Sequence, residues 1–428
     1  MVRRFLICWV LALAAFAPIY DAAAQSAAAP FPRLGAYLIA GSVQSAFGTT
    51  SYQQQVAKLG AAVIGTYPGW SSGGYNMQSA AAAVKAINPN IRLTIYANIM
   101  EFESNSTNSS SPYYPLWTTV NNNNWLLRRP WPSGSVVIDT SSLSAINITA
   151  TPYIQWRAGY DAKNNFTANW DGIYLDAFFW APRSDGDYAQ NGTTQSHTNP
   201  TTQQSWRNAY AAYVGYLRAA LPAGAQVWGN TADWANGSLN GYSQLLNGGV
   251  MESIIGQSYS YESQGWAVMM NAYHLIMNET TASGYQIFEQ DGSATDYQGM
   301  RYGLAACLMD NGYYYFNVTG PGGGSVITWF DEFNAALGAA TSSPQTAAWQ
   351  NGVYRRDFQN GIALVNPKGN GPRTVTLETT YKHLSGTQVP SINNGQSVTT
   401  VTLNDRDGVI LQRLTSQAVP DAPTLTVQ

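Results

Sequence analysis

Short apolar runs alternate with longer amphipathic stretches between residues 33 and 316. The runs hold four to seven residues each and are rich in Val, Ile, Leu and Tyr. This composition is typical of strands in a parallel sheet that is buried on both faces. We predict eight strands, at 34–39, 62–67, 91–97, 172–176, 226–230, 249–253, 285–289 and 313–316.

Apolar residues at every third or fourth position predict helices between these strands. The clearest helix is 201–221, whose aromatic and leucine side chains form one stripe. Pro200 stands near its start, where a missing N–H costs little, and Pro222 ends it. Further helices are predicted at 51–59, 78–87, 263–277 and 294–308. Eight strands alternating with helices predict an α/β fold of the (β/α)8 or TIM-barrel type, with a doubly wound open sheet as the alternative.

The pattern changes after residue 345. Five strands without intervening helices are predicted at 352–358, 361–366, 373–379, 398–403 and 408–414. The Asn-Gly pair at 360–361 and the Asp-Gly pair at 407–408 are turn signals, so we predict a small antiparallel β-sandwich domain. The expected organisation is a catalytic barrel at 25–345 with a long insertion at 100–170, the β domain at 346–415, and a flexible tail at 416–428.

The first 24 residues have the features of a signal peptide. Arg3 and Arg4 precede an apolar run at 5–19, and the alanines at 22–24 offer small residues for cleavage. The run is short for a membrane span. We therefore expect a secreted or periplasmic protein that has no membrane contact after cleavage, with Cys307 as its single remaining cysteine.

The 428-residue chain has few charged residues (11%) and many aromatic ones (13%). A net charge of −3 provides no basic surface for nucleic acid, and three His and two Cys argue against a zinc cluster. No motif predicts a cofactor or a metal. The Gly-rich segment 320–325 lacks the lysine of a phosphate loop, and 184–187 lacks the full spacing of a calcium loop. Aromatic surfaces with few charges suit sugar rings, and they equally suit a large core.

Carboxylates follow three of the predicted strands. Asp176, Glu252 and Glu289 end strands 4, 6 and 7, and function in such a barrel lies at the carboxyl ends of the strands. Two carboxylates facing each other suit glycoside hydrolysis, where one donates a proton and the other is ionised. We predict Asp176 and Glu252 as the catalytic pair. Glu289 is left open between substrate binding and an outward ion pair with Arg301, whereas Asp171 is expected at the opposite barrel end as a turn or cap residue.

Other side chains at this end of the barrel are candidates for substrate binding. Asn98 and Asn230 end strands 3 and 5. Aromatic residues follow strands 2, 4, 5 and 6, where they either stack on sugar rings or simply pack in the core. They are Tyr67, Trp70, Trp180, Trp234, Tyr259 and Tyr261, of which Trp70 and Trp180 are the preferred candidates because they follow strand ends.

The segment Asp171-Gly-Ile-Tyr-Leu-Asp176 resembles the strand-4 signature of barrel glycoside hydrolases. These include the α-amylase and α-galactosidase superfamilies and endo-α-1,4-polygalactosaminidase-like proteins. Together with Asn230, Glu252 and Glu289, it looks most like a glycosyl hydrolase-like barrel family of unassigned activity. The resemblance implies that Asp176 is the nucleophile or base and Glu252 the acid/base. The α-galactosidase-like pattern has Asp on strand 6, so Glu252 departs from it and leaves the linkage open.

A second similarity lies at the start of the predicted β domain. The segment from Tyr354 to Pro367 is similar to the start of the β domain that often follows such barrels.

These observations favour an exported glycoside hydrolase that acts on a polysaccharide or oligosaccharide. A carbohydrate-binding protein without activity is the alternative, since a fold can persist without its chemistry. A transglycosylase would use the same site. The spacing of Asp176 and Glu252 in the sequence does not fix their distance, so retaining and inverting mechanisms both stay open at this level.

Overall fold

The computed structural model describes residues 30–414, apart from 68, 103, 139–142, 165, 167, 233–244 and 280–283. The predicted signal peptide and tail therefore lie outside the described residues, as does Trp234. Eight parallel strands form one sheet in the order β1-β2-β5-β10-β11-β12-β13-β14. Their bounds are β1 (Gly35–Leu38), β2 (Ala61–Ile64), β5 (Arg92–Asn98), β10 (Gly172–Asp176), β11 (Gln226–Asn230), β12 (Gly248–Ile255), β13 (Tyr285–Asp291) and β14 (Tyr313–Asn317).

The sheet closes on itself. Leu34 forms a parallel bridge with Tyr314, whose backbone N–H donates to the carbonyl of Arg33 at 2.9 Å. The last strand is thereby joined to the first, so the sheet is a barrel and the open-sheet alternative is wrong. All eight predicted strands are present, because each is an apolar run buried on both faces.

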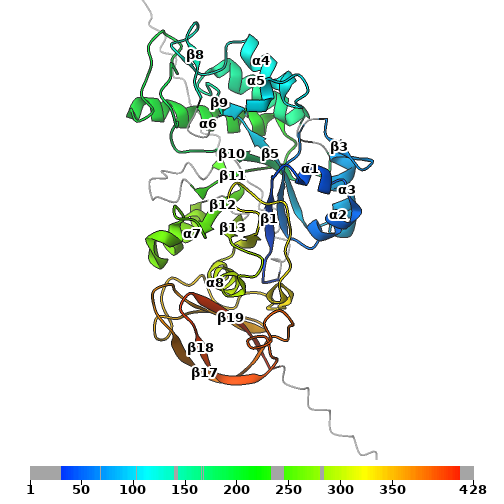
Figure 1. Ribbon diagram of the computed structural model, residues 1–428, viewed down its shortest axis with the longest axis vertical. Helices are drawn as coiled ribbons and strands as arrows, with labels where there is room; N and C mark the ends of the chain where they lie inside the picture. The colour runs from blue at the N-terminus through cyan, green and yellow to red at the C-terminus, as the bar shows by residue number, and fades with distance from the viewer. Residues whose placement is uncertain are drawn as a thin grey trace, which may run out of the picture.

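Helices surround the barrel (Figure 1). Local caps explain where some of them start: the Asn76 and Ser79 side chains cap one helix reciprocally, and Asn199 accepts from the Thr201 N–H at the start of another. The helices between barrel strands are α1 (Val43–Ala46), α2 (Thr50–Val56), α3 (Met77–Ile87), α5 (Thr151–Asn164), α6 (Pro200–Ala220), α7 (Trp266–Glu279) and α8 (Tyr297–Cys307). A short hairpin, β3 (Ser71–Ser72) with β4 (Tyr75–Asn76), precedes α3.

The segment between β5 and β10 carries its own structure. Besides α5, it contains α4 (Tyr114–Asn122), the 3-10 turn η1 (Ser104–Thr107) and two small antiparallel pairs. The pairs are β6 (Glu101–Phe102) with β9 (Ser144–Ala145), and β7 (Arg128–Arg129) with β8 (Ser135–Val136). The segment predicted as one long insertion thus holds two helices, one of which belongs to the barrel. Apolar residues such as Leu126 and Ile146 are buried at the centre of this segment.

A five-stranded antiparallel sheet forms the C-terminal domain, in the order β15-β16-β19-β17-β18. This confirms the expected combination of a TIM barrel with an antiparallel β domain. The strands are β15 (Tyr354–Phe358), β16 (Gly361–Asn366), β17 (Arg373–His383), β18 (Ser397–Leu403) and β19 (Asp407–Arg413). Between the barrel and this domain lies the 3-10 turn η5 (Asp331–Asn334).

The turn predicted at Asp407-Gly408 is wrong. Both residues belong to β19, and the chain turns before them, at Asp405 and Arg406. The reason is tertiary: Asp407 accepts hydrogen bonds from the guanidinium of Arg301 on α8, at 2.9 Å to the nearer oxygen. This buried ion pair joins the β domain to the barrel, which lie end to end along the long axis of the molecule (Figure 1).

In the part of the chain that the structure describes, no helix is both long enough and apolar enough to cross a membrane.

Candidate active site

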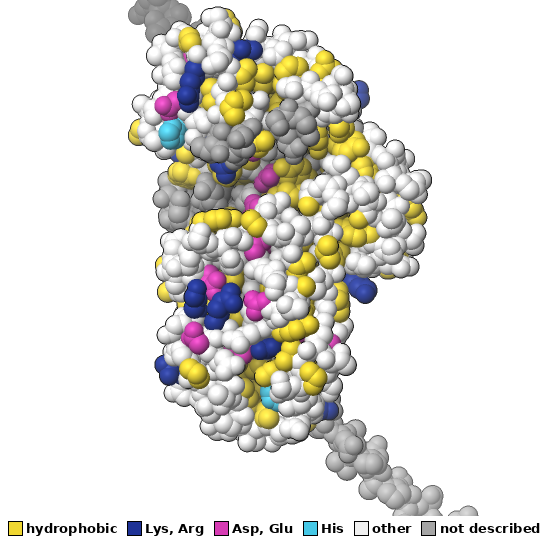
Figure 2. Space-filling model, viewed as in Figure 1, with side chains coloured by type: hydrophobic (Ala, Val, Ile, Leu, Met, Phe, Trp, Pro, Cys, Tyr) yellow, Lys and Arg dark blue, Asp and Glu magenta, His cyan; other side chains and the backbone are white. Residues whose placement is uncertain are grey.

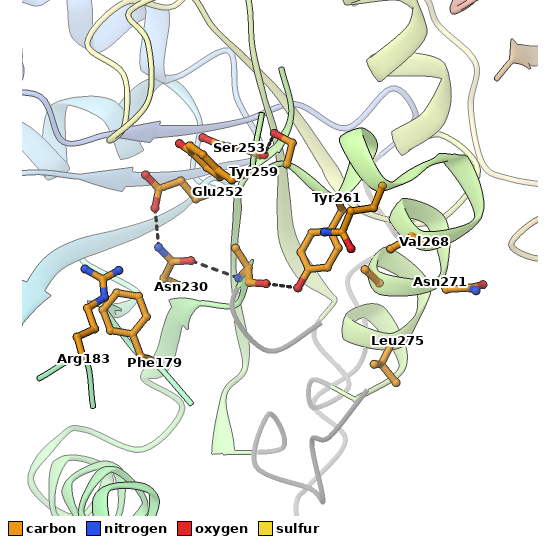
Figure 3. A pocket seen from close by; sticks show the side chains of 14 residues that line it. Phe179, Arg183, Asn230, Glu252, Ser253, Tyr259, Tyr261, Val268, Asn271 and Leu275 are labelled. Atoms are coloured by element: carbon orange, nitrogen blue, oxygen red, sulfur yellow. Dashed lines mark hydrogen bonds between the residues drawn. The ribbon is translucent and has the colours of Figure 1, made fainter. Parts of the chain in front are cut away.

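Three neighbouring strands bring the central residues of the site together. Asp176 ends β10, Asn230 ends β11, and Glu252 lies on β12. The side-chain amide nitrogen of Asn230 donates to Asp176 Oδ1 at 3.2 Å and to Glu252 Oε2 at 2.6 Å. Figure 3 shows the second of these bonds, between Asn230 and Glu252. Both oxygens contact one nitrogen, so the sum of 3.2 Å and 2.6 Å, about 5.8 Å, is the upper limit of their separation.

Asp176 has a second donor on its other side. The hydroxyl of Tyr96, on β5, donates to Asp176 Oδ2 at 2.8 Å. Burial, followed by the charge of Asp176, raises the pKa of Tyr96 well above its usual value, so this hydroxyl keeps its proton. Each of the two carboxyl oxygens of Asp176 therefore has its own hydrogen-bond donor.

Glu252 has the opposite environment. Burial, followed by the negative charge of Asp176, raises the pKa of Glu252 to about 7, and the hydrogen bond from Asn230 only partly opposes this shift. A carboxyl group with this pKa exchanges its proton near neutral pH, as a general acid/base must. The two carboxylates thus differ in environment as the acid and the nucleophile of a glycosidase differ.

Two buried tyrosines lie close to these carboxylates. Tyr37 on β1 and Tyr174 on β10 pack against each other with ring centroids 5.2 Å apart. The pKa of each is raised well above its usual value, first by burial and then by the charge of Asp176. Neither hydroxyl has a hydrogen-bond partner of ordinary geometry among the described residues. Buried donors that keep their protons beside a carboxylate are suited to hold a polar group, such as a water or a sugar hydroxyl.

Glu289 lies inside the barrel and is fully buried. It accepts from the Ser253 backbone N–H at 3.3 Å and from the Asn317 side-chain amide at 3.0 Å. The same Asn317 nitrogen donates to Asp291 at 3.1 Å. Burial and then the charge of Glu252 raise the pKa of Glu289 well above its usual range. The outward pair with Arg301 is wrong, because Arg301 binds Asp407 instead.

The backbone is strained directly after both candidate catalytic residues. Ala177, which follows Asp176, has a φ of 52°, and Ser253, which follows Glu252, has a φ of 49°. Residues with side chains rarely adopt this left-handed conformation, which costs about 1–3 kcal/mol and is concentrated at functional sites. The hydrophobic pattern carries no signal for it.

A cavity of about 830 Å³ opens beside Glu252. Its polar wall is made of Asn230, Glu252 and Ser253, and its other walls come from the segments after β10 and β12 (Figure 3). Tyr259, predicted for substrate binding, lines the cavity and is 65% exposed. Arg183 also lines the cavity, and its guanidinium carbon lies 3.5 Å from the ring centre of Phe179; no motif in the sequence predicts it. Acidic side chains lie along the middle of this face of the molecule, with apolar side chains near the upper ones and Lys or Arg next to the lower ones (Figure 2).

Tyr261, another of the predicted aromatic residues, also lines this cavity, whereas Tyr67, Trp70 and Trp180 do not. Trp70 is 2% exposed, packs on Phe47, and donates from its indole nitrogen to the Gln44 carbonyl at 2.8 Å. It is a core residue with no open ring face for a sugar. Trp180 is half-buried with the guanidinium of Arg207 over its ring.

Two candidates near β5 have neighbours other than the carboxylate pair. Tyr67 packs edge-on against Tyr113, with ring centroids 6.0 Å apart. Asn98 stands opposite Asp176 in the strand register, but its amide donates to Glu101 at 3.1 Å. Both side chains remain at the carboxyl end of the barrel, next to the pair rather than in contact with it.

Asp171 lies at the amino end of β10, away from the site. It accepts from Lys85 Nζ at 2.7 Å, from Arg92 Nη1 at 3.0 Å and from the Leu93 N–H at 2.8 Å. The expected structural role agrees with these contacts. Within the described ranges, no group of three or more metal-binding side chains comes together.

Comparisons with known proteins agree with this architecture. A search of curated protein sequences found no relative of the chain. The structure of Amy13B from Eubacterium rectale superposes with a TM-score of 0.50 and 9% identity, over 89% of this chain and 94% of that one. An α-amylase from Anoxybacillus gives a TM-score of 0.47 and 7% identity, over 88% and 91%. At such identities the similarity is one of fold. The sequence profile described as "Hypothetical glycosyl hydrolase family 15" matches residues 85–362, which is more than half of the chain. The chain therefore belongs to this family of hypothetical glycosyl hydrolases.

Proposed function

We propose that the protein is a secreted glycoside hydrolase that cleaves a polysaccharide or oligosaccharide with retention of configuration at the anomeric carbon. The observation that carries the proposal is the shared donor. The side-chain amide nitrogen of Asn230 donates hydrogen bonds to both Asp176 and Glu252.

The upper limit of about 5.8 Å between the nearest oxygens favours retention. Retaining glycosidases keep their two carboxyl groups about 5–5.5 Å apart. Inverting glycosidases need about 6.5–9.5 Å, because a water must fit between the general base and the sugar. Two oxygens bound to one nitrogen leave too little separation for the inverting arrangement.

The reaction then runs in two steps. Protonated Glu252 gives its proton to the glycosidic oxygen while the Asp176 carboxylate attacks the anomeric carbon, so the leaving sugar departs with a new hydroxyl. Ionised Glu252 next takes a proton from water, whose oxygen attacks the same carbon and releases Asp176. The hydroxyl of Tyr96 donates to the Asp176 carboxylate before the first step and again after the second, when Asp176 is not bonded to the sugar.

A panel of bacterial and plant polysaccharides, with detection of new reducing ends, tests this function. The wild type should hydrolyse a member of the panel, and Asp176→Asn and Glu252→Gln should each lower kcat by about 10³-fold or more. Proton NMR of the first product should show the anomer of the substrate linkage. Turnover that survives Asp176→Asn, or inversion of the product, would contradict the assignment.

Two alternatives give different results in the same assay. A carbohydrate-binding protein would bind a glycan from the panel without releasing reducing ends. A transglycosylase would change product lengths without a net gain of reducing ends.

Export is part of the proposal, and it rests on the N-terminal sequence alone. N-terminal sequencing of the mature protein from the culture medium or periplasm should begin at Gln25, after the alanines at 22–24. An intact Met1 on the cell-associated protein would contradict it.

A further inference from the structure

The segment after Glu252 forms one wall of the cavity. Strand β12 ends at Ile255, and the chain continues through residues 256–265, including the 3-10 turn η4 (Tyr261–Gln264), before α7 begins. We call residues 256–265 the β12 loop. Tyr259, Ser260, Tyr261 and Gln264 of this loop line the cavity, so its position determines the shape of the site (Figure 3).

Contacts on the barrel side hold the first part of the β12 loop. The Gln257 amide donates to Asp291 Oδ2 at 3.0 Å, and the Ser260 hydroxyl donates to the Ser253 carbonyl. Further along, the Tyr261 hydroxyl donates to the Ala232 carbonyl at 2.7 Å. These bonds place the loop directly beside the strand ends that carry the carboxylates.

A further contact of the β12 loop comes from the β domain. Glu262 is 6% exposed, and its Oε1 accepts from Arg406 Nε at 2.6 Å while its Oε2 accepts from Arg406 Nη2 at 3.4 Å. Arg406 belongs to the turn between β18 and β19, and its guanidinium lies over the ring of Tyr302 on α8, 5.1 Å from the centroid. A charge-assisted, two-point contact of this kind fixes geometry as well as adding stability.

The backbone of Arg406 supports a specific role for its side chain. Its φ is 54°, in the left-handed region where Gly or Asn is the ordinary choice for a turn. An arginine there costs conformational energy that the turn itself does not require. The one feature that Arg supplies and Gly or Asn lacks is the guanidinium that reaches Glu262.

We propose that Arg406 is a positioning residue of the active site, which holds the β12 loop through Glu262 so that the β domain completes the substrate-binding wall. The proposal rests on the proposed function in one respect, namely that the β12 loop contacts the glycan. It gives the C-terminal domain a role in catalysis that is separate from its hydrophobic packing on α8.

Hydrogen exchange of the full-length protein tests the contact without any substrate. Arg406→Asn removes the guanidinium and also suits the left-handed turn, so the turn should still form. Amides of the β12 loop should exchange about tenfold faster in this variant, as expected for the loss of about 1.4 kcal/mol of local stability. Glu262→Gln combined with Arg406→Asn avoids a buried unpaired carboxylate and should show the same acceleration.

A matched control exists within the β domain. Arg355 forms ion pairs with Asp357 and Glu378 on the same domain, away from the β12 loop. Arg355→Asn should therefore leave exchange in the β12 loop unchanged. On the panel polysaccharide that the wild type hydrolyses fastest, Arg406→Asn should raise KM about three- to tenfold with kcat within about twofold, whereas Arg355→Asn should change neither.

Unchanged exchange in the β12 loop of both Arg406 variants would overturn the proposal. So would faster exchange combined with an unchanged KM, because the contact would then be structural only. If the wild type hydrolyses no member of the panel, the proposed function fails, and the exchange measurement still decides whether Arg406 holds the loop.

Discussion

Asp176 and Glu252, 76 positions apart in the chain, accept hydrogen bonds from the same nitrogen, the side-chain amide of Asn230, at 3.2 Å and 2.6 Å. The relationship is asymmetric in its consequences. Asp176 has a second donor in Tyr96, whereas burial and the charge of Asp176 raise the pKa of Glu252. The neutral amide of Asn230 therefore donates to two different carboxyl groups. Asp176 has a second hydrogen-bond donor, and Glu252 has a pKa raised to about 7.

Replacing Asn230 should change the pH profile as well as the rate. Its hydrogen bond lowers the pKa of Glu252, so Asn230→Ala should shift the alkaline limb of kcat/KM to higher pH. Loss of a donor to both carboxylates should also lower kcat by about 10²-fold. Asn98→Ala is the matched control, because Asn98 donates to Glu101 and not to the pair. An unshifted limb in Asn230→Ala would argue against the shared donor.

Stability should depend on pH through Glu252. Folding raises its pKa from the ordinary 4.5 to about 7, so the folded state binds more protons than the unfolded state between these values. The contribution is fully present below about pH 4.5 and is lost as the pH rises through 7. Thermal unfolding from pH 4.5 to 8 should show a smaller decline for Glu252→Gln than for the wild type. Equal slopes for the two proteins would contradict the raised pKa.

Activity should fall over the alkaline part of the same range. In the proposed mechanism Glu252 must carry a proton to protonate the leaving group, and above about pH 7 its deprotonated form dominates. The kcat/KM of the wild type should therefore decline with a single-proton slope on the alkaline side, measured on the panel substrate. A rate that stays constant up to pH 9 would exclude Glu252 as the general acid.

Asp171, which precedes β10, and Asp176, which ends it, should affect stability and activity separately. Asp171 binds Lys85 and Arg92 at the amino end of the barrel, so Asp171→Ala should cost about 2–3 kcal/mol of unfolding free energy. The folded fraction should retain its KM. Asp176→Asn should have the reverse effect, with lost turnover and little change in stability. Urea denaturation and kinetics on the same preparations measure both, and a catalytic defect in folded Asp171→Ala would contradict the division.

Tyr259 should contribute to substrate affinity rather than to folding. Its ring is exposed beside the cavity, so Tyr259→Ala should raise KM about three- to tenfold, the equivalent of about 0.5–1.5 kcal/mol of stacking. Its unfolding midpoint should stay close to that of the wild type. Tyr216, another partly exposed tyrosine, lies on α6 and does not line the cavity, so Tyr216→Ala is the control. Equal KM values in both variants would remove Tyr259 from the site.

Much of the barrel could be predicted because each of its strands can be recognised from its own residues. A parallel strand covered on both faces must be apolar throughout, so the run 172–176 is visible without any knowledge of its neighbours. A carboxylate that ends such a run is equally visible, which is why Asp176 and Glu252 were found. The helix α5 inside the expected insertion was missed because its apolar stripe is weak among polar residues.

Contacts between distant segments were not predictable in the same way. Trp70 was expected at the rim because it follows a strand, but whether an aromatic ring stacks on substrate or fills the core depends on what packs against it. The turn expected at Asp407 is a strand because Arg301, 106 positions away, binds its carboxylate. No spacing in the chain encodes such a pairing.

Three features can be recognised from the amino-acid sequence alone: the alternation of eight strands with helices, the change to antiparallel strands after the barrel, and the acidic residues at strand ends. Each of these depends on a periodicity or on a polar residue ending an apolar run. The contacts between side chains depend on the tertiary structure. Asn230 donates to both Asp176 and Glu252, Tyr96 donates to Asp176, and Arg406 donates to Glu262, 144 positions away. The reason is physical, because burial, shared donors and pKa values arise from the distances that barrel closure and domain packing create.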